Sequence, residues 1–229
     1  IISVNIFYNF NEIYYCHPHF YVNRLTIMKL YSILLYAKKQ KVDYYMRNYK
    51  TKNMILCAMF VALIAVGAFI KIPVPAVPFT LQYLFTMLAG LLLGAKLGFI
   101  SVCIYIALGL AGLPVFASGG GISYIFQPSF GYIIGFAVGT FVTGKIARRN
   151  EAPGYARVLA ANFAGLGIVY LFGMIYYYLI SNLYLGTPFG LWPLFFYCFL
   201  IVVPGDIVTC ILGAILGKRL IPLINAGKI

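Results

Sequence analysis

The chain has 229 residues, of which 63% are hydrophobic and 9% charged, and its mean hydropathy is +0.94. Soluble domains average about 45–50% apolar and about 25% charged residues, so this chain has too few charges to cover the surface of a soluble globule. Its 20 Tyr and 19 Phe residues exclude a disordered protein. The composition therefore predicts an integral membrane protein.

The net charge of +13 comes from 17 Lys and Arg residues against 4 Asp and Glu residues. Such a charge can indicate nucleic-acid binding, but the sequence has no RRM, zinc-finger or helix-turn-helix signature. Most basic residues beyond residue 53 stand at the ends of apolar runs, as the cytoplasmic flanks of membrane spans do. We therefore expect the lipid bilayer as the environment and no nucleic-acid partner.

Residues 1–53 differ from the rest, because they are rich in Tyr, Asn, Ile and Lys and contain no secretory signal. Met46 lies just before the first strong apolar run, so this N-terminal extension is expected to be disordered or over-translated. An interfacial helix around Leu25–Lys41 is the alternative. His17 and His19 have no further candidate ligands beside them, and we expect no metal site.

Residues 54–229 are expected to form one all-α domain with six transmembrane helices. A span needs about 20 apolar residues, and six segments approach this length. They are Met54–Ile72, Phe79–Ala95, Leu97–Leu113, Pro128–Gly144, Val158–Ile180 and Trp192–Gly217.

Basic residues give these spans an orientation. Lys96 follows the second span, a cluster of basic residues within Lys145–Arg157 follows the fourth, and Lys218 and Arg219 follow the sixth. The loops at the other ends of the spans have no charged residue except Lys71. Because basic flanks stay on the cytoplasmic side, we predict a multi-pass protein of the cell membrane with both termini in the cytoplasm.

Small residues recur at four-residue spacing in several spans, which lets helix backbones approach closely in lipid. The sets are Ala58/Ala62, Gly90/Gly94, Gly131/Gly135/Gly139 and Gly213/Gly217. We expect internal packing for most of them, and Ala58/Ala62 is the best candidate for a groove that takes a partner helix.

Asp206 lies inside the sixth span, 12 residues (218 − 206) before Lys218. At about 1.5 Å per residue it is roughly 18 Å from the inner flank, near the middle of the bilayer. A charge at that depth costs about 2.5–3.5 kcal/mol, so Asp206 is predicted to be functional; a structural hydrogen-bond acceptor is the alternative. Pro204 and Gly205 can break the helix just before it, and Thr209 shares its helical face.

The uncharged loop between the third and fourth spans contains three consecutive glycines, Gly119–Gly121. Glycine lets a ligand approach the backbone closely, and Phe116 and Tyr124 offer apolar surface nearby. With the stiff segment Pro73–Pro78 and with Asp206, this loop could enclose a small, partly apolar ligand. A flexible loop without such a role is the alternative.

Catalysis is not expected. An intramembrane aspartyl protease needs two carboxylates and the bilayer holds one, while no His follows His19 to serve a zinc or serine enzyme. We therefore predict no catalytic residue and no cofactor.

Several motifs occur together over about residues 50–222. They are Ala58-x-x-x-Ala62, Pro78-Phe-Thr-Leu-Gln82, Leu88-Ala-Gly-Leu-Leu-Leu-Gly94, Gly109-Leu-Ala-Gly-Leu-Pro-Val-Phe-Ala117, Gly119–Gly121, Pro128-Ser-Phe-Gly-Tyr-Ile-Ile-Gly135 and Pro204-Gly-Asp206. In this combination the chain resembles the BioY family, the biotin-specific substrate-binding (S) components of energy-coupling factor (ECF) transporters.

The resemblance implies a six-helix protein that captures biotin from outside and associates with a transmembrane scaffold protein and cytoplasmic ABC-type ATPases. Scaffold docking would use Ala58 and Ala62. Biotin contacts would fall on Ser118, Gly121, Tyr124, Tyr132, Asp206 and Thr209, with Gln82, Gly119 and Gly120 as further loop positions.

The sequence departs from the family at Thr209, where a Lys is common three residues after the Asp, and at Ser118, where a longer polar side chain is common. The change at Thr209 could alter affinity or specificity, and Lys71 could compensate if its side chain reaches the cavity. Two other functions stay open: an S component for another small vitamin, and a stand-alone proton-coupled carrier with Asp206 as its titrating group.

Overall fold

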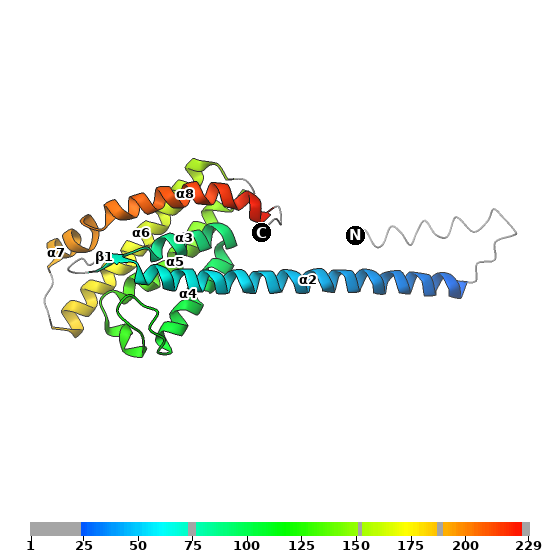
Figure 1. Cartoon of the computed structure of the whole chain (residues 1–229), viewed down its shortest axis with the longest axis horizontal. Coiled ribbons are helices and arrows are strands. Elements are labelled where there is room, and N and C mark those ends of the chain that lie inside the picture. Colours follow the sequence, from blue (N-terminus) through cyan, green and yellow to red (C-terminus); the bar gives the residue numbers. More distant parts are fainter. Residues whose placement is uncertain (1–23, 73–76, 151–152, 187–189, 226–229) are drawn as a thin grey trace. The chain divides into compact units, whose positions relative to one another are not determined.

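The computed structural model describes residues 24–72, 77–150, 153–186 and 190–225, and these are mostly helical (Figure 1). The chain divides into two compact units, Ile1–Lys50 and Thr51–Ile229, and the boundary falls within helix α2 (Arg24–Phe69). The range Leu25–Lys41 lies within α2, and its position at a membrane interface stays a prediction. His17 and His19 lie outside the described residues, and whether the native protein contains the N-terminal extension stays a prediction.

The second unit contains the end of α2 and all the remaining elements. These are β1 (Lys71–Ile72), β2 (Phe79–Thr80), α3 (Gln82–Leu93), α4 (Ala95–Leu110), the 3-10 turn η2 (Ile122–Phe126), α5 (Phe130–Ala147), α6 (Tyr155–Leu179) with the π-helical turn η3 (Ile180–Tyr184), α7 (Leu191–Phe195), the π-helical turn η4 (Phe196–Leu200) and α8 (Val203–Asn225).

Four helical stretches of the described chain are long and apolar enough to cross a membrane. They are Lys50–Phe69, Phe130–Ala147, Tyr155–Tyr184 and Leu191–Ile224. Helices α3 and α4 are apolar but have only 12 and 16 residues, or about 18 and 24 Å at the usual rise, less than the ~30 Å hydrocarbon core. All six predicted segments coincide with apolar helices, and the fold is that of a helical membrane protein. The count of six spans is not confirmed, because two helices are short and the last segment is divided into α7 and α8.

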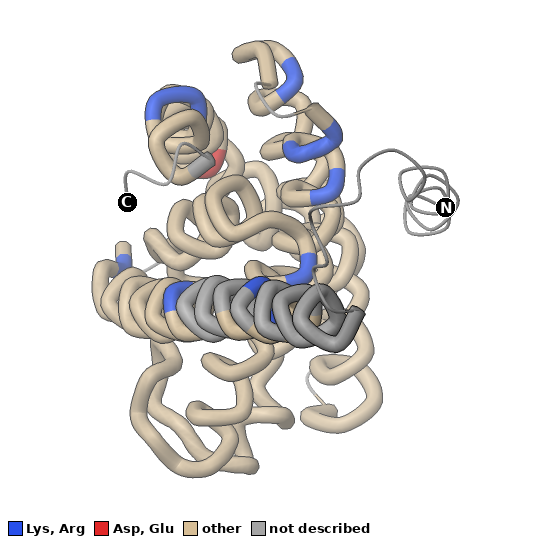
Figure 2. Tube along the Cα trace, turned by 90° about the vertical axis from the view of Figure 1, so that its right-hand side faces the viewer, with Lys and Arg blue, Asp and Glu red and all other residues tan. Residues whose placement is uncertain are grey.

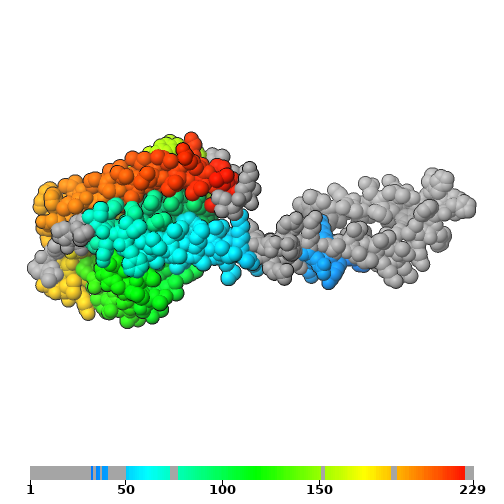
Figure 3. All heavy atoms as spheres, viewed as in Figure 1, coloured from blue at the N-terminus to red at the C-terminus, as the bar shows by residue number. Residues whose placement is uncertain are grey.

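The glycines of α5 allow this helix to pack closely along α6. A Cβ atom on Gly135 would stand 2.9 Å from the Cα of Val169, and one on Gly139 would stand 2.9 Å from the carbonyl oxygen of Gly165. Larger side chains would separate the helices, so these glycines serve the internal packing that their spacing predicts. Ala58 and Ala62 differ, because both are exposed on the part of α2 that lies at the surface of the second unit in Figure 3.

Basic residues of the second unit lie near helix ends. Lys145 is in the last turn of α5, and Lys96 is in the first turn of α4. Figure 2 shows several Lys and Arg residues on the side of this unit turned to the viewer, while the loops at the bottom of the view show none. Lys71 belongs to β1 instead, between α2 and α3.

The β1–β2 pair and the start of α8 determine the positions of Lys71 and Asp206. β1 and β2 pair antiparallel, with Lys71 opposite Thr80. A turn at residues 201–202 interrupts the last apolar segment, and α8 begins at Val203. Proline is tolerated in a first helical turn because the amide there has no helical partner, so the break predicted beside Pro204 is confirmed and Asp206 lies in the first turn of α8.

Candidate functional site

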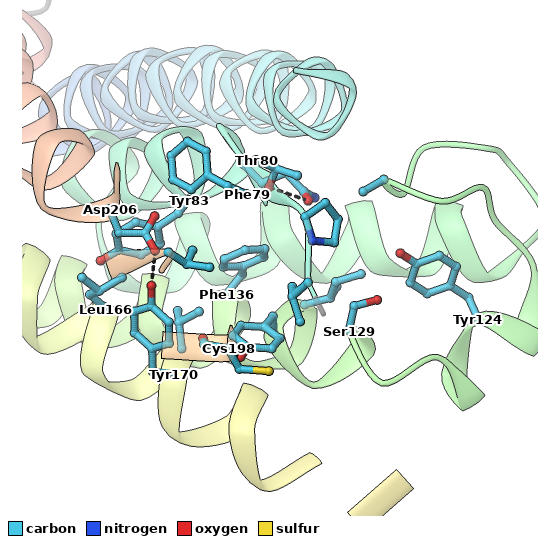
Figure 4. A pocket seen from close by; sticks show the side chains of 18 residues that line it. Phe79, Thr80, Tyr83, Tyr124, Ser129, Phe136, Leu166, Tyr170, Cys198 and Asp206 are labelled. Atoms are coloured by element: carbon cyan, nitrogen blue, oxygen red, sulfur yellow. Dashed lines mark hydrogen bonds between the residues drawn. The ribbon is translucent and has the colours of Figure 1, made fainter. Parts of the chain in front are cut away.

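One pocket is lined by side chains of β2 and the segment before it, of the loop after α4, and of helices α3, α5, α6 and α8 (Figure 4). The pocket is partly open to the surroundings, and its wall combines polar and apolar side chains. Its lining consists of Val77, Pro78, Phe79, Thr80, Gln82, Tyr83, Ala117, Tyr124, Ser129, Tyr132, Ile133, Phe136, Leu166, Val169, Tyr170, Cys198, Val202 and Asp206.

Asp206 is the acidic residue of this lining, and its side chain is 7% exposed. The hydroxyl of Tyr170 donates a hydrogen bond of 2.5 Å to its Oδ2, as the dashed line in Figure 4 shows. The positive end of the α8 dipole also favours a carboxylate in the first turn. Among the described residues, no hydrogen bond is made to Oδ1, which leaves this oxygen to accept from a ligand.

A chain of hydrogen bonds fixes the pocket wall opposite α6. Thr80 Oγ1 donates to Gln82 Oε1 (3.2 Å), and Gln82 Nε2 donates to the Tyr105 hydroxyl (2.7 Å). That hydroxyl donates in turn to the carbonyl oxygen of Val115 (2.9 Å). The chain connects β2, α3 and α4 to the loop after α4, so Gln82 is held in place at the pocket surface.

Aromatic rings form part of the remaining wall. Tyr132 and Tyr170 meet edge to face with their centroids 6.2 Å apart, and the Tyr132 hydroxyl donates to the carbonyl oxygen of Cys198 (3.1 Å). Tyr124 packs on Phe116, with centroids 4.6 Å apart, and Phe116 itself is buried outside the lining. Such surfaces suit a ligand with an apolar body.

The structure brings four of the predicted site residues to the pocket: Gln82, Tyr124, Tyr132 and Asp206. The other predicted positions lie outside its lining, and their part in binding stays a prediction. These positions are Ser118, Gly119, Gly120, Gly121 and Thr209.

Hydrogen bonds within the protein occupy several of these positions. The amide of Gly119 donates to the carbonyl oxygen of Phe116, and that of Gly121 donates to the carbonyl oxygen of Gly109 (2.7 Å). The hydroxyl of Thr209 donates to the backbone oxygen of Asp206 (2.9 Å). The glycine loop therefore uses two of its amides to fix its own shape, where the sequence alone indicates amides open to a ligand.

Sequence reasoning missed Tyr170, Phe136 and Ser129. Tyr170 is one of 20 tyrosines, and no local motif distinguishes it from its neighbours in an apolar helix. Its partner Asp206 is 36 positions away, so only the packing of α6 against α8 reveals the pair. Within the described residues, no group of three or more His, Cys, Asp or Glu side chains could hold a metal ion.

Comparisons with known proteins show the family of this chain. A model of the BioY family matches residues 38–226. A protein of Lysinibacillus sphaericus named probable biotin transporter BioY is 43% identical over 183 residues, which cover 80% of this chain and 93% of that protein. The biotin transporter BioY of Rhizobium etli is 34% identical over 191 residues, which cover 77% of this chain and 98% of that one.

A solved structure shares the fold as well. The S-component for biotin from an ECF-type ABC transporter matches with a TM-score of 0.63 and 33% identity, over 76% of this chain and 92% of that one. The family model and the relatives both extend over most of the chain. This chain therefore belongs to the BioY family.

Proposed function

We propose that this chain takes up biotin, by capturing it at the outer face of the cell membrane as the S component of an ECF-type transporter. The observation that carries the proposal is the buried carboxylate of Asp206, which lines the pocket and accepts a hydrogen bond from Tyr170 at Oδ2. The names of the relatives and of the related solved structure support biotin as the ligand.

The chemistry of biotin fits this pocket. Its ureido ring has two N–H donors and one carbonyl, and a desolvated carboxylate such as Asp206 is a strong acceptor for such donors. The rings of Tyr132 and Tyr124 can cover the apolar bicycle and chain. We assign direct contacts to these lining residues and to Gln82. We assign Ser118 and Gly119–Gly121 to the shape of the loop that carries Ala117 and Tyr124. The Thr209 hydroxyl donates a hydrogen bond to the backbone oxygen of Asp206.

The rest of the assembly is also a proposal. Six helices cross the membrane, with the short α3 and α4 among them, and the basic residues near Lys96, Lys145 and Lys218 keep both termini in the cytoplasm. The exposed pair Ala58 and Ala62 docks a transmembrane scaffold protein, through which two cytoplasmic ATPases drive translocation.

A binding panel on the purified chain tests this function. We expect saturable binding of biotin at micromolar concentration or below, and no comparable binding of other small vitamins. Tighter binding of a different vitamin would replace biotin as the substrate. Biotin uptake by this chain alone, abolished by an uncoupler, would favour a proton-coupled carrier instead.

A further inference from the structure

Lys71 occupies an unusual position for a basic residue of this chain. The lining of the pocket contains one carboxylate, Asp206, and no Lys or Arg among the described residues. Lys71 lies on β1, and its Nζ donates a hydrogen bond of 2.8 Å to the carbonyl oxygen of Ala117, which is a lining residue. A second lining residue, Thr80, is the direct strand partner of Lys71.

These two contacts place the ammonium group beside the pocket. Directly opposed residues of an antiparallel pair direct their side chains to the same face, so the Lys71 side chain shares the face of Thr80. From there its Nζ reaches Ala117 in the loop after α4. The ammonium therefore lies beside the lining residue Ala117, on the face of the hairpin that carries Thr80.

In the part of the chain that the structure describes, no carboxylate forms an ion pair with Lys71. The four acidic residues of the chain are Glu12, Asp43, Glu151 and Asp206, and only Asp206 belongs to a segment that lines the pocket. An ammonium group has three N–H donors, and the hydrogen bond to Ala117 uses one. Two donors of Lys71 are thus left for an anionic group without breaking the contact to the loop.

The pocket is consequently polar at two separate places. Figure 4 shows Asp206 and Tyr170 on one side and Tyr124 on the other, with Thr80 between them. We infer that Lys71 binds the carboxylate of the ligand at the outer edge of the pocket, while Asp206 binds its N–H donors at the opposite side. This inference rests on the proposed function and extends it, because it requires a ligand with a free carboxylate and assigns a residue to that group.

A paired comparison of ligand and protein tests the assignment. Biotin and biotinamide, in which the carboxylate is replaced by a neutral amide, are titrated against the purified wild-type chain, Lys71→Met and Lys71→Arg. Because Lys71 is exposed and ion pairs in contact with water are weak, we expect Lys71→Met to lower the affinity for biotin about five- to tenfold. The affinity for biotinamide should change less than about twofold, and Lys71→Arg should keep the preference for biotin.

The outcomes separate the inference from the function on which it rests. Equal weakening of biotin and biotinamide by Lys71→Met would show that Lys71 only holds the loop through Ala117, and would overturn the inference. No effect on either ligand would overturn it as well. A wild-type chain that binds neither ligand would instead contradict the proposed function.

Discussion

The hydroxyl of Tyr170 on α6 donates a hydrogen bond of 2.5 Å to Oδ2 of Asp206 on α8. This contact satisfies one oxygen of a buried carboxylate and fixes the direction in which the other one points. Both residues line the pocket, so we expect the hydrogen bond to orient an acceptor toward the ligand. We therefore propose that Tyr170 is a positioning residue for Asp206.

Removing the Tyr170 hydroxyl should weaken the binding of biotin without abolishing it. Tyr170→Phe keeps the ring that packs against Tyr132 and loses only the donor to Asp206. A hydrogen bond to a charged group contributes about 1.5–3 kcal/mol, so we expect roughly a tenfold or larger rise in the Kd for biotin, measured by isothermal titration calorimetry. Tyr178→Phe, at an exposed position of the same helix, is the control and should leave the Kd unchanged; equal Kd values for both variants would count against the positioning role.

Gly205 sets the distance between α8 and the β1–β2 hairpin. A Cβ atom at this position would lie 2.7 Å from Cε2 of Phe79, a lining residue. Gly205→Ala should displace the ring or the first turn of α8, at a cost of about 1–3 kcal/mol. We expect weaker biotin binding and a lower Tm in detergent.

The control for Gly205→Ala is Gly167→Ala. A Cβ atom on Gly167 would have no neighbour within 4 Å, and Ala is the better helix former, so neither binding nor Tm should fall. Wild-type values for Gly205→Ala would show that the hairpin and α8 tolerate more space than the structure indicates.

The exposed face of α2 should matter for uptake and not for binding. Ala58→Trp fills the small-residue groove beside Ala62, and both alanines are exposed and absent from the lining. We expect the purified variant to bind biotin like the wild type, whereas uptake of labelled biotin by cells that also express the scaffold and ATPases should be lost. Gly167→Trp puts the same ring on an exposed position of α6 and should leave uptake intact, and equal uptake by both variants would exclude Ala58 from docking.

The rarity of charged residues in apolar spans explains which parts of the site could be predicted from the sequence. A carboxylate within an apolar span is costly, so Asp206 stands out among the acidic residues, and the break beside Pro204 follows from backbone chemistry. No sequence feature distinguishes Tyr170 and Phe136 in this way, because aromatic residues are common throughout this chain. Their place in the pocket depends on how α5, α6 and α8 pack.

The glycine loop shows what the composition of a segment does not predict. Composition indicates backbone freedom at Gly119 and Gly121, and both have positive φ angles of 117° and 102°. It does not indicate where their amides bond, and the structure directs them to Phe116 and Gly109. Similarly, hydropathy located α3 but not its bounds, because the predicted span Phe79–Ala95 begins with strand β2. The helix ends at Leu93, before Gly94 with its positive φ.

The central claim is that Asp206 is the main polar contact for biotin. Equilibrium binding of labelled biotin to the purified wild-type chain and to Asp206→Asn tests it most directly, with Thr143→Val as the control. Removing the charge from a buried, hydrogen-bonded acceptor should weaken binding roughly 30-fold or more. Thr143→Val loses a buried hydroxyl that donates to the carbonyl oxygen of Ala161, outside the pocket lining, and should bind within about twofold of the wild type, whereas wild-type affinity in Asp206→Asn would contradict the account.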